Sequence, residues 1–263
     1  MTYSAVKSLV AVIAAIVLST AICFGQTASV SVQPFADAFV TPGASGSLSS
    51  SNFGGAGSLA IGASGLPQGE FQSVLQFDLS GARNSFNAQF GVGQWTIQSV
   101  TLQLTSSPHN NPIFNDIAVG QFNVSLMQNN SWVEGTGTGG IPGSDGISYS
   151  SLLGTYLNNA TDQALGTFNF PGGSSGQNSY VLSLSSGLLS DATSGSDLSL
   201  RLFAADSAVS YLFTSRSGGA AARPDILVQA VVVPEPSTVA LCGAALVVLL
   251  VVQVVRHGAG RKS

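Results

Sequence analysis

Apolar and polar residues alternate along most of the chain between residues 26 and 233. Residues 73–79, for example, place Leu75, Phe77 and Leu79 on one side at a period of two. Such alternation is typical of half-buried antiparallel strands. We expect strands at 28–33, 73–79, 99–104, 122–126, 166–170, 180–184, 198–203, 211–215 and 225–230.

Clusters of Gly, Pro, Asn and Ser separate these segments, as in Pro42-Gly43 and Pro142-Gly143, and they are typical of turns. We find no clear long helix, although 150–158 and 187–192 are compatible with short helical turns. Nine or ten strands joined by polar loops predict an all-β fold, an antiparallel β-sandwich. No repeat divides residues 26–231, so we expect one domain there.

The first 25 residues have the layout of a secretory signal peptide. Lys7 precedes an apolar stretch from Leu9 to Phe24, and small residues surround a possible cleavage site after Gly25. Cys23 follows Ile22, whereas a lipoprotein signal has Gly or Ala at that position, so lipidation is the less favoured alternative. A second alternative is that residues 1–25 remain uncleaved as an N-terminal membrane anchor. We expect residues 1–25 to direct export.

The C-terminal residues suggest a membrane anchor. An apolar run from Thr238 to Val255 would span about 27 Å as a helix, close to the thickness of a bilayer core. Basic residues are spread through the tail at 256–263, which predicts a cytoplasmic tail with everything upstream outside. The sequence Pro234-Glu235-Pro236 directly precedes this run.

The order of tripeptide, apolar helix and basic end resembles the PEP-CTERM sorting signal of Gram-negative bacteria. In that family an exosortase, a membrane cysteine protease-transpeptidase, recognises the tripeptide and passes the protein to the cell surface or matrix. The resemblance covers residues 232–263 and implies an exosortase as partner. Here Gly258, Ala259 and Gly260 dilute the basic cluster, and a plain tail anchor is the alternative.

Charge and cysteine content narrow the possible functions. Residues 26–233 hold eleven acidic residues, four arginines and no lysine, a net charge of about −7. Nucleic-acid binding requires a basic face, so we expect no nucleic-acid partner. Cys23 and Cys242 are the only cysteines, and both lie outside this region, which therefore folds without a disulfide and offers no thiol nucleophile.

A second resemblance covers residues 28–231. The ordered segments 37–40, 51–54, 59–62, 73–79, 97–104, 132–134, 213–216 and 223–228 are similar to the DNRLRE-domain family. The resemblance implies a jelly-roll-like β-sandwich on an exported protein, and in some members binding of acidic polysaccharide. Where the family has Arg before the Leu-x-Phe-Asp strand and Glu after Ser-Arg, this chain has Gln72 or Ser73, and Ser217.

Several residues are candidates for binding. Asp37 and Asp78, with carbonyls of the 52–57 loop, offer the oxygen ligands that Ca²⁺ prefers, although a structural bond to a loop amide is the simpler role for each. In the 51–54 segment, Asn52 is expected to bond its own turn, Phe53 to plug one end of the core, and Gly54 to allow positive φ.

Sugar rings stack on exposed aromatic faces, which makes Trp132, in the loop-like 129–134 segment with Glu134, a candidate for ligand binding; Tyr149 is another. The alternative for Trp132 is that it caps the core of the sandwich, and the same structural role is expected for Trp95.

Catalytic motifs are absent from the sequence. His109 is the only histidine between the two ends, and Glu70 and Glu134 could form the carboxylate pair of a glycoside hydrolase only by an arrangement the sequence does not reveal. We therefore expect a non-catalytic, exported surface or matrix protein that associates with exopolysaccharide. The alternatives are a structural surface protein without a ligand and, less favoured, a polysaccharide-cleaving enzyme.

Overall fold

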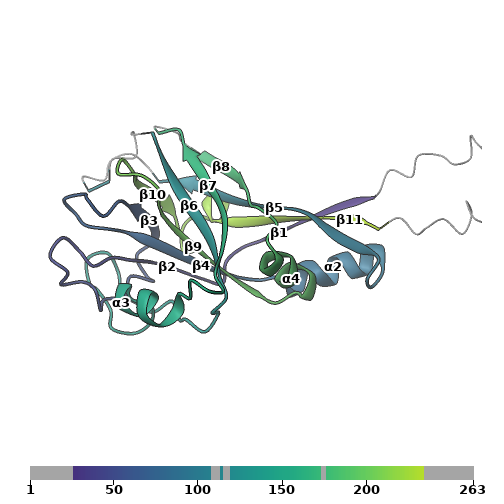
Figure 1. The fold of residues 1–263 in the computed structure, drawn as a ribbon, viewed down its shortest axis with the longest axis horizontal. Helices are drawn as coiled ribbons and strands as arrows, with labels where there is room; N and C mark the ends of the chain where they lie inside the picture. Colours follow the sequence, from purple (N-terminus) through teal and green to yellow (C-terminus); the bar gives the residue numbers. More distant parts are fainter. Residues whose placement is uncertain (1–25, 108–112, 115–118, 173–175, 234–263) are drawn as a thin grey trace, which may run out of the picture. The chain divides into compact units, whose positions relative to one another are not determined.

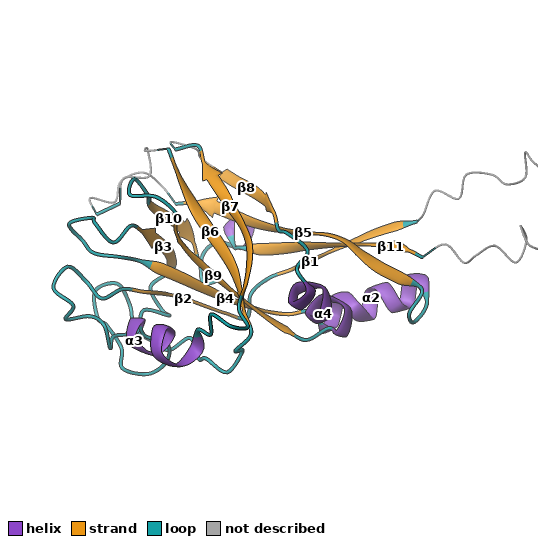
Figure 2. Cartoon of the chain, viewed as in Figure 1, coloured by secondary structure: helices purple, strands orange, loops and turns teal. Residues whose placement is uncertain are grey.

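Two antiparallel β-sheets face each other in the computed structural model of the chain, which describes residues 26–107, 113–114, 119–172 and 176–233 (Figures 1 and 2). Thr27–Val231 forms one compact unit. The all-β prediction is confirmed, with eleven strands in the described residues where nine or ten were expected. The predicted signal peptide, sorting motif 234–236 and membrane helix 238–255 lie outside the described residues. Within those residues, no helix combines the length and apolar character of a membrane span.

The first sheet, sheet A, has the strand order β1–β11–β5–β10–β3, with β8 also paired to β5. Its strands are β1 (Thr27–Val32), β3 (Ser58–Gly62), β5 (Trp95–Ser106), β8 (Gly176–Val181), β10 (Ser210–Thr214) and β11 (Asp225–Val232). β8 begins and ends earlier than the predicted strand at 180–184. β3 comes from one of the segments that carry the DNRLRE resemblance.

The second sheet, sheet B, has the order β2–β4–β9–β6–β7. Its strands are β2 (Ala36–Val40), β4 (Gln72–Asp78), β6 (Gly120–Met127), β7 (Gln163–Phe170) and β9 (Asp197–Ala204). Alternate residues of both sheets meet in one core, where the ring centroids of Phe122 in β6 and Phe213 in β10 are 6.1 Å apart. The hydroxyl of Ser73 in β4 crosses between the sheets, since it accepts from the amide of Ala60 and donates to the carbonyl of the same residue, both at 2.8 Å.

The outer face of sheet B is also buried, because the long connection between β6 and β7 folds over it. Alternate residues of β2, such as Ala36 and Val40, pack there against Trp132 and Leu152. The connection contains α3 (Tyr149–Ser151), capped by Ser148, and the π-helix η1 (Leu152–Tyr156), which together match the helical turn predicted at 150–158. The 3₁₀-helix η2 (Ala220–Ala222) precedes β11.

Two helices add to the core below β5. The helix α4 (Ser186–Ser194) contains the predicted turn at 187–192, but α2 (Ser80–Phe90) was not predicted. The two helices pack on each other (Figure 1), and Phe86 of α2 and Leu188 of α4 are fully buried in the main core. Trp95 also belongs to this core, in keeping with the structural role expected for it. Its indole nitrogen donates to Asn87 Oδ1 at 2.8 Å.

Candidate functional site

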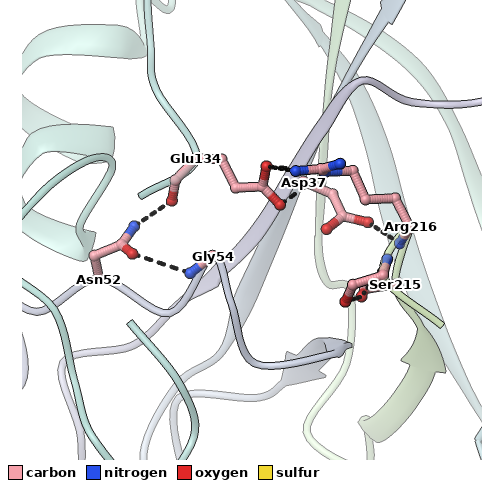
Figure 3. Close-up of polar contacts among 7 residues, drawn as sticks. Asp37, Asn52, Gly54, Glu134, Ser215 and Arg216 are labelled. Atoms are coloured by element: carbon pink, nitrogen blue, oxygen red, sulfur yellow. Dashed lines mark hydrogen bonds and ion pairs between the residues drawn. The ribbon is translucent and has the colours of Figure 1, made fainter. Parts of the chain in front are cut away.

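Four segments that are far apart in the sequence meet at one polar cluster (Figure 3). Asp37 lies on β2, Asn52 on the loop before β3, Glu134 on the connection after β6, and Arg216 on the turn after β10. Hydrogen bonds and one ion pair link these side chains or their backbones. Each of the four comes from a segment that carries the DNRLRE resemblance, so the residues of that resemblance converge in space.

Asn52 is fully buried and uses its amide in four hydrogen bonds. Its Nδ2 donates to the carbonyl oxygens of Glu134 at 2.5 Å and Ile147 at 2.8 Å. Its Oδ1 accepts from the amides of Gly54 at 3.0 Å and Gly137 at 3.1 Å. Asn52 thus bonds its own turn, as expected, and also fixes the 134–147 loop to that turn.

Gly54 is required by close approach rather than by the positive φ that the sequence suggested. A Cβ at this position would lie 2.1 Å from the carbonyl oxygen of Glu134. A Cβ on Gly137 would lie 1.9 Å from the carbonyl oxygen of Asn52. Phe53 is buried and stacks on Phe39 with centroids 4.7 Å apart, in a small apolar cluster distinct from the main core.

Glu134 is held by Arg216 and is therefore not a free carboxylate. Nε of Arg216 donates to both oxygens of Glu134 at 2.9 Å, and its Nη2 forms an ion pair with Oε2. Side-chain exposure is 39% for Arg216 and 14% for Glu134, so the pair is partly shielded from solvent. The Glu134 carboxylate holds the pKa of Arg216 above its usual value.

Asp37 is the most unusual carboxyl of the cluster. It is 1% exposed, and it lies on the core face of sheet B because it pairs with Leu75 across β2 and β4. Its Oδ2 accepts from the amide of Arg216 at 2.6 Å, whereas Oδ1 is buried and has no donor among the described residues. Burial raises the pKa of Asp37 to about 7, and the bond from the Arg216 amide opposes that rise.

Asp78 does not join Asp37. It is exposed at the end of β4, one residue from buried Phe77, so it points to the opposite face of sheet B. Its Oδ1 accepts from the amide of Ser80 at 2.8 Å, which starts α2, and bonds to Ser80 lower the pKa of Asp78. Each aspartate therefore makes the structural amide bond that was the simpler alternative to calcium binding. The described residues also show no group of three or more His, Cys, Asp or Glu side chains suited to hold a metal ion.

The predicted aromatic binding residues are engaged within the protein. Trp132 is 3% exposed and its indole nitrogen donates to Ser199 Oγ at 3.0 Å, so neither ring face is open to a ligand. This position fits the alternative that Trp132 packs in a core, here the one outside sheet B. Tyr149 is half-buried and donates to Glu70 Oε2 at 2.7 Å; burial together with Glu70 raises the pKa of Tyr149 to about 12.

The partner of Glu134 was missed by reasoning from the sequence. In the sequence analysis Arg216 appeared only within a segment of the DNRLRE resemblance. One indication was available, because residues 26–233 contain only four arginines. Because this region has so few basic residues, a partly buried carboxylate such as Glu134 is a reasonable place to expect one of them as an ion-pair partner. Arg201 is engaged differently: its Nε donates to the amide oxygen Oε1 of Gln72 at 2.7 Å, and its guanidinium lies 4.1 Å from the ring centroid of Phe203.

Comparisons with known proteins do not place the chain in a family. No protein-family model matches the sequence, and no match appears among the curated proteins.

Proposed function

We propose that the chain is an exported, non-catalytic β-sandwich protein that an exosortase sorts to the cell surface or matrix, where its folded domain associates with exopolysaccharide. The observation that carries this proposal is the order of Pro234-Glu235-Pro236, an apolar run and a basic end. The N-terminal pattern of residues 1–25 agrees with export. A two-sheet domain that needs no cysteine is suited to folding outside the membrane.

The strand order supports a jelly-roll-like form of the sandwich. Without β1, β2 and β11, sheet A reads β3–β10–β5–β8 and sheet B reads β4–β9–β6–β7. Every step along the chain from β3 to β10 crosses between the sheets, except the step from β6 to β7. This is the arrangement of an eight-stranded double-sheet jelly roll.

The convergence of Asp37, Asn52, Glu134 and Arg216 supports the DNRLRE resemblance. Residues separated by 82 to 179 positions are joined through direct bonds, which favours the view that the segments that suggested the family act together in this fold. Their bonds are internal, which favours a shared architecture over a shared binding site.

A non-catalytic role is favoured over polysaccharide cleavage because both glutamates are engaged. Glu134 pairs with Arg216, and Glu70 accepts from the hydroxyl of Tyr149 and from Gln72 Nε2. A glycoside hydrolase needs two carboxyl groups flanking one bond, free to exchange a proton and to attack. A structural surface protein without a ligand is the remaining alternative, and binding measurements separate it from the proposal.

The sorting part is tested by mass spectrometry of the mature protein purified from its host. We expect both termini to be shortened, near residue 25 and near the 234–236 motif, and the C-terminal cut to disappear when the exosortase is deleted. Replacing Glu235 with Ala should also abolish the C-terminal cut, while the neighbouring Ser237→Ala serves as control. An intact, unprocessed chain in the cytoplasm would overturn the proposal.

A further inference from the structure

Two adjoining hollows form a polar groove at the side of sheet B where β6, η1, β7 and α4 come together. The first has a volume of about 600 Å³ and is lined by Gln128, Asn129, Asn130, Ser131, Thr155, Tyr156, Asn158 and Thr161. The second has about 430 Å³ and includes Ser186, Ser190 and Asp191. Gln128 and Thr161 line both hollows, so the two lie next to each other. Each volume is within the usual range of small-ligand sites.

Hydrogen bonds to the side chains of Asp162 and Gln163 fix the walls of the groove. Asp162 accepts from the amide of Gln128 at 3.0 Å with one oxygen and from the amide of Asn158 at 2.9 Å with the other. On the far side, Gln163 Oε1 accepts from the amide of Gly187 at 2.9 Å, which fixes the start of α4 against β7. A groove held in this way loses little conformational freedom when a ligand enters.

Several polar groups in the walls are left for a ligand. Within the described part of the chain, no hydrogen bond engages the side-chain amide of Gln128 or the hydroxyls of Thr155, Tyr156 and Ser190. These groups are uncharged donors and acceptors distributed over the two hollows, and the half-buried ring of Tyr156 lines the first.

The charges around the groove argue against an anionic ligand. None of the residues lining either hollow is basic, and Asp191 is among them, with Asp162 bound in the wall. The domain as a whole is acidic. An anionic chain would meet like charge without a cation to pair with. Amides, hydroxyls and an aromatic ring suit hydroxyl-rich, uncharged sugar units instead.

We propose that this groove binds a neutral polysaccharide chain, with Thr161 and Gln128 at the junction of two consecutive subsites. This inference rests on the proposed function and specifies its ligand and its site. It differs from the acidic polysaccharide that some members of the DNRLRE family bind, and its lining does not include Trp132, Glu134 or Tyr149. The residues involved come from the loop after β6, from η1 and the loop after it, from the start of β7 and from α4.

The test is calorimetric titration of the full chain, solubilised in a zwitterionic detergent because a sugar-headed detergent would compete for the groove. The probes are three neutral hexasaccharides, cellohexaose, laminarihexaose and maltohexaose, and a hexamer of alginate as the acidic arm. We expect at least one neutral hexasaccharide to bind and the alginate hexamer not to bind.

Two variants then locate the site. Thr161→Trp fills the junction from an exposed position and should weaken binding at least about tenfold, whereas Thr96→Trp, on the exposed face of β5, should leave it unchanged. Gln128→Ala removes one ligand bond but keeps the backbone bond to Asp162, and should weaken binding about threefold to tenfold. Unchanged thermal unfolding of each variant shows that folding is intact.

The outcomes separate the two proposals. If a neutral hexasaccharide binds equally well to Thr161→Trp, the groove is the wrong site, and polysaccharide association by the domain remains. If alginate binds in place of the neutral sugars, the ligand class inferred from the groove is wrong. If no probe binds to the unmodified chain, both the groove and the polysaccharide association are overturned, and the structural alternative is favoured.

Discussion

Asp37 should make the stability of the domain fall as pH rises through neutrality. Burial raises its pKa from 3.8 to about 7. The folded state therefore retains a proton that the unfolded state has already lost, and the stabilisation from this proton is full below about pH 4 and disappears as pH passes 7. Three pKa units correspond to about 4 kcal/mol, an upper limit because the fold relaxes around a new charge.

Replacing Asp37 with Asn isolates this effect. Asparagine keeps the shape of the side chain and an oxygen that accepts from the amide of Arg216, and it stays neutral at every pH. Below about pH 4 the carboxyl is protonated in both the folded and the unfolded state, so the variant and the natural chain should have nearly equal free energies of unfolding; by pH 5 the variant should already be more stable by about 1–2 kcal/mol. At pH 8 the variant should be more stable, by up to about 4 kcal/mol.

Urea denaturation of both chains, followed by circular dichroism at about pH 3.5, 5, 6, 7 and 8, measures the difference. Asp191 needs a control, since burial raises its pKa to about 6 and contributes in the same direction. An Asp191→Asn chain should still lose stability between pH 6 and 8, and the double variant should not. If Asp37→Asn destabilises the fold by the same amount at every pH, then Asp37 is ionised throughout and the reasoning is refuted.

Three further substitutions test the loops around the cluster. Asn52→Asp should destabilise the fold by about 3–5 kcal/mol in urea at pH 8, because an oxygen then faces two carbonyls; a smaller loss than that of Asn52→Ala would contradict this. Gly54→Ala should cost more than about 3 kcal/mol through its clash with a backbone oxygen, whereas Gly139→Ala, with open space around it, should stay within about 0.5 kcal/mol. Trp132→Phe should lower the unfolding free energy by about 1–2 kcal/mol, since Ser199 loses its indole donor; unchanged stability would show that this bond contributes little.

Nine of the eleven strands were accessible from the sequence because their signal is local, whereas β2 and β3, which are buried almost throughout, lack the alternation and were not predicted. Burial in β11 alternates residue by residue from Ile226 to Ala230, and the printed sequence shows the same period. The helix α2 was not accessible for the opposite reason. Its buried stripe consists of Ala82 and Phe86, and its residues include a glycine and two asparagines, which disfavour helix. Packing against α4 and Trp95 stabilises a helix that local propensity does not predict.

The polar cluster was only partly predictable. Asp37, Asn52 and Glu134 were each singled out, but nothing local indicates that Asn52 bonds the backbone of Glu134 across 82 positions. Burial of Trp132 was likewise open, since the 129–134 segment reads as a loop and the cover it forms over sheet B depends on tertiary packing. The groove was missed because Asn, Ser and Thr in its walls are the residues of any surface loop.

The bonding of the cluster also bears on where a ligand can be recognised. All four hydrogen bonds of the Asn52 side chain go to backbone atoms, and the Glu134 carboxylate is paired with Arg216. Gly54 is fixed by its close contact with a neighbouring loop. Residues used in this way constrain the fold and leave no group to discriminate between ligands. Specificity must then come from side chains without internal partners, and the wall of the groove around Gln128 and Tyr156 holds several of them. The cluster therefore constrains the architecture, and under the proposed function recognition of the polysaccharide falls to the groove.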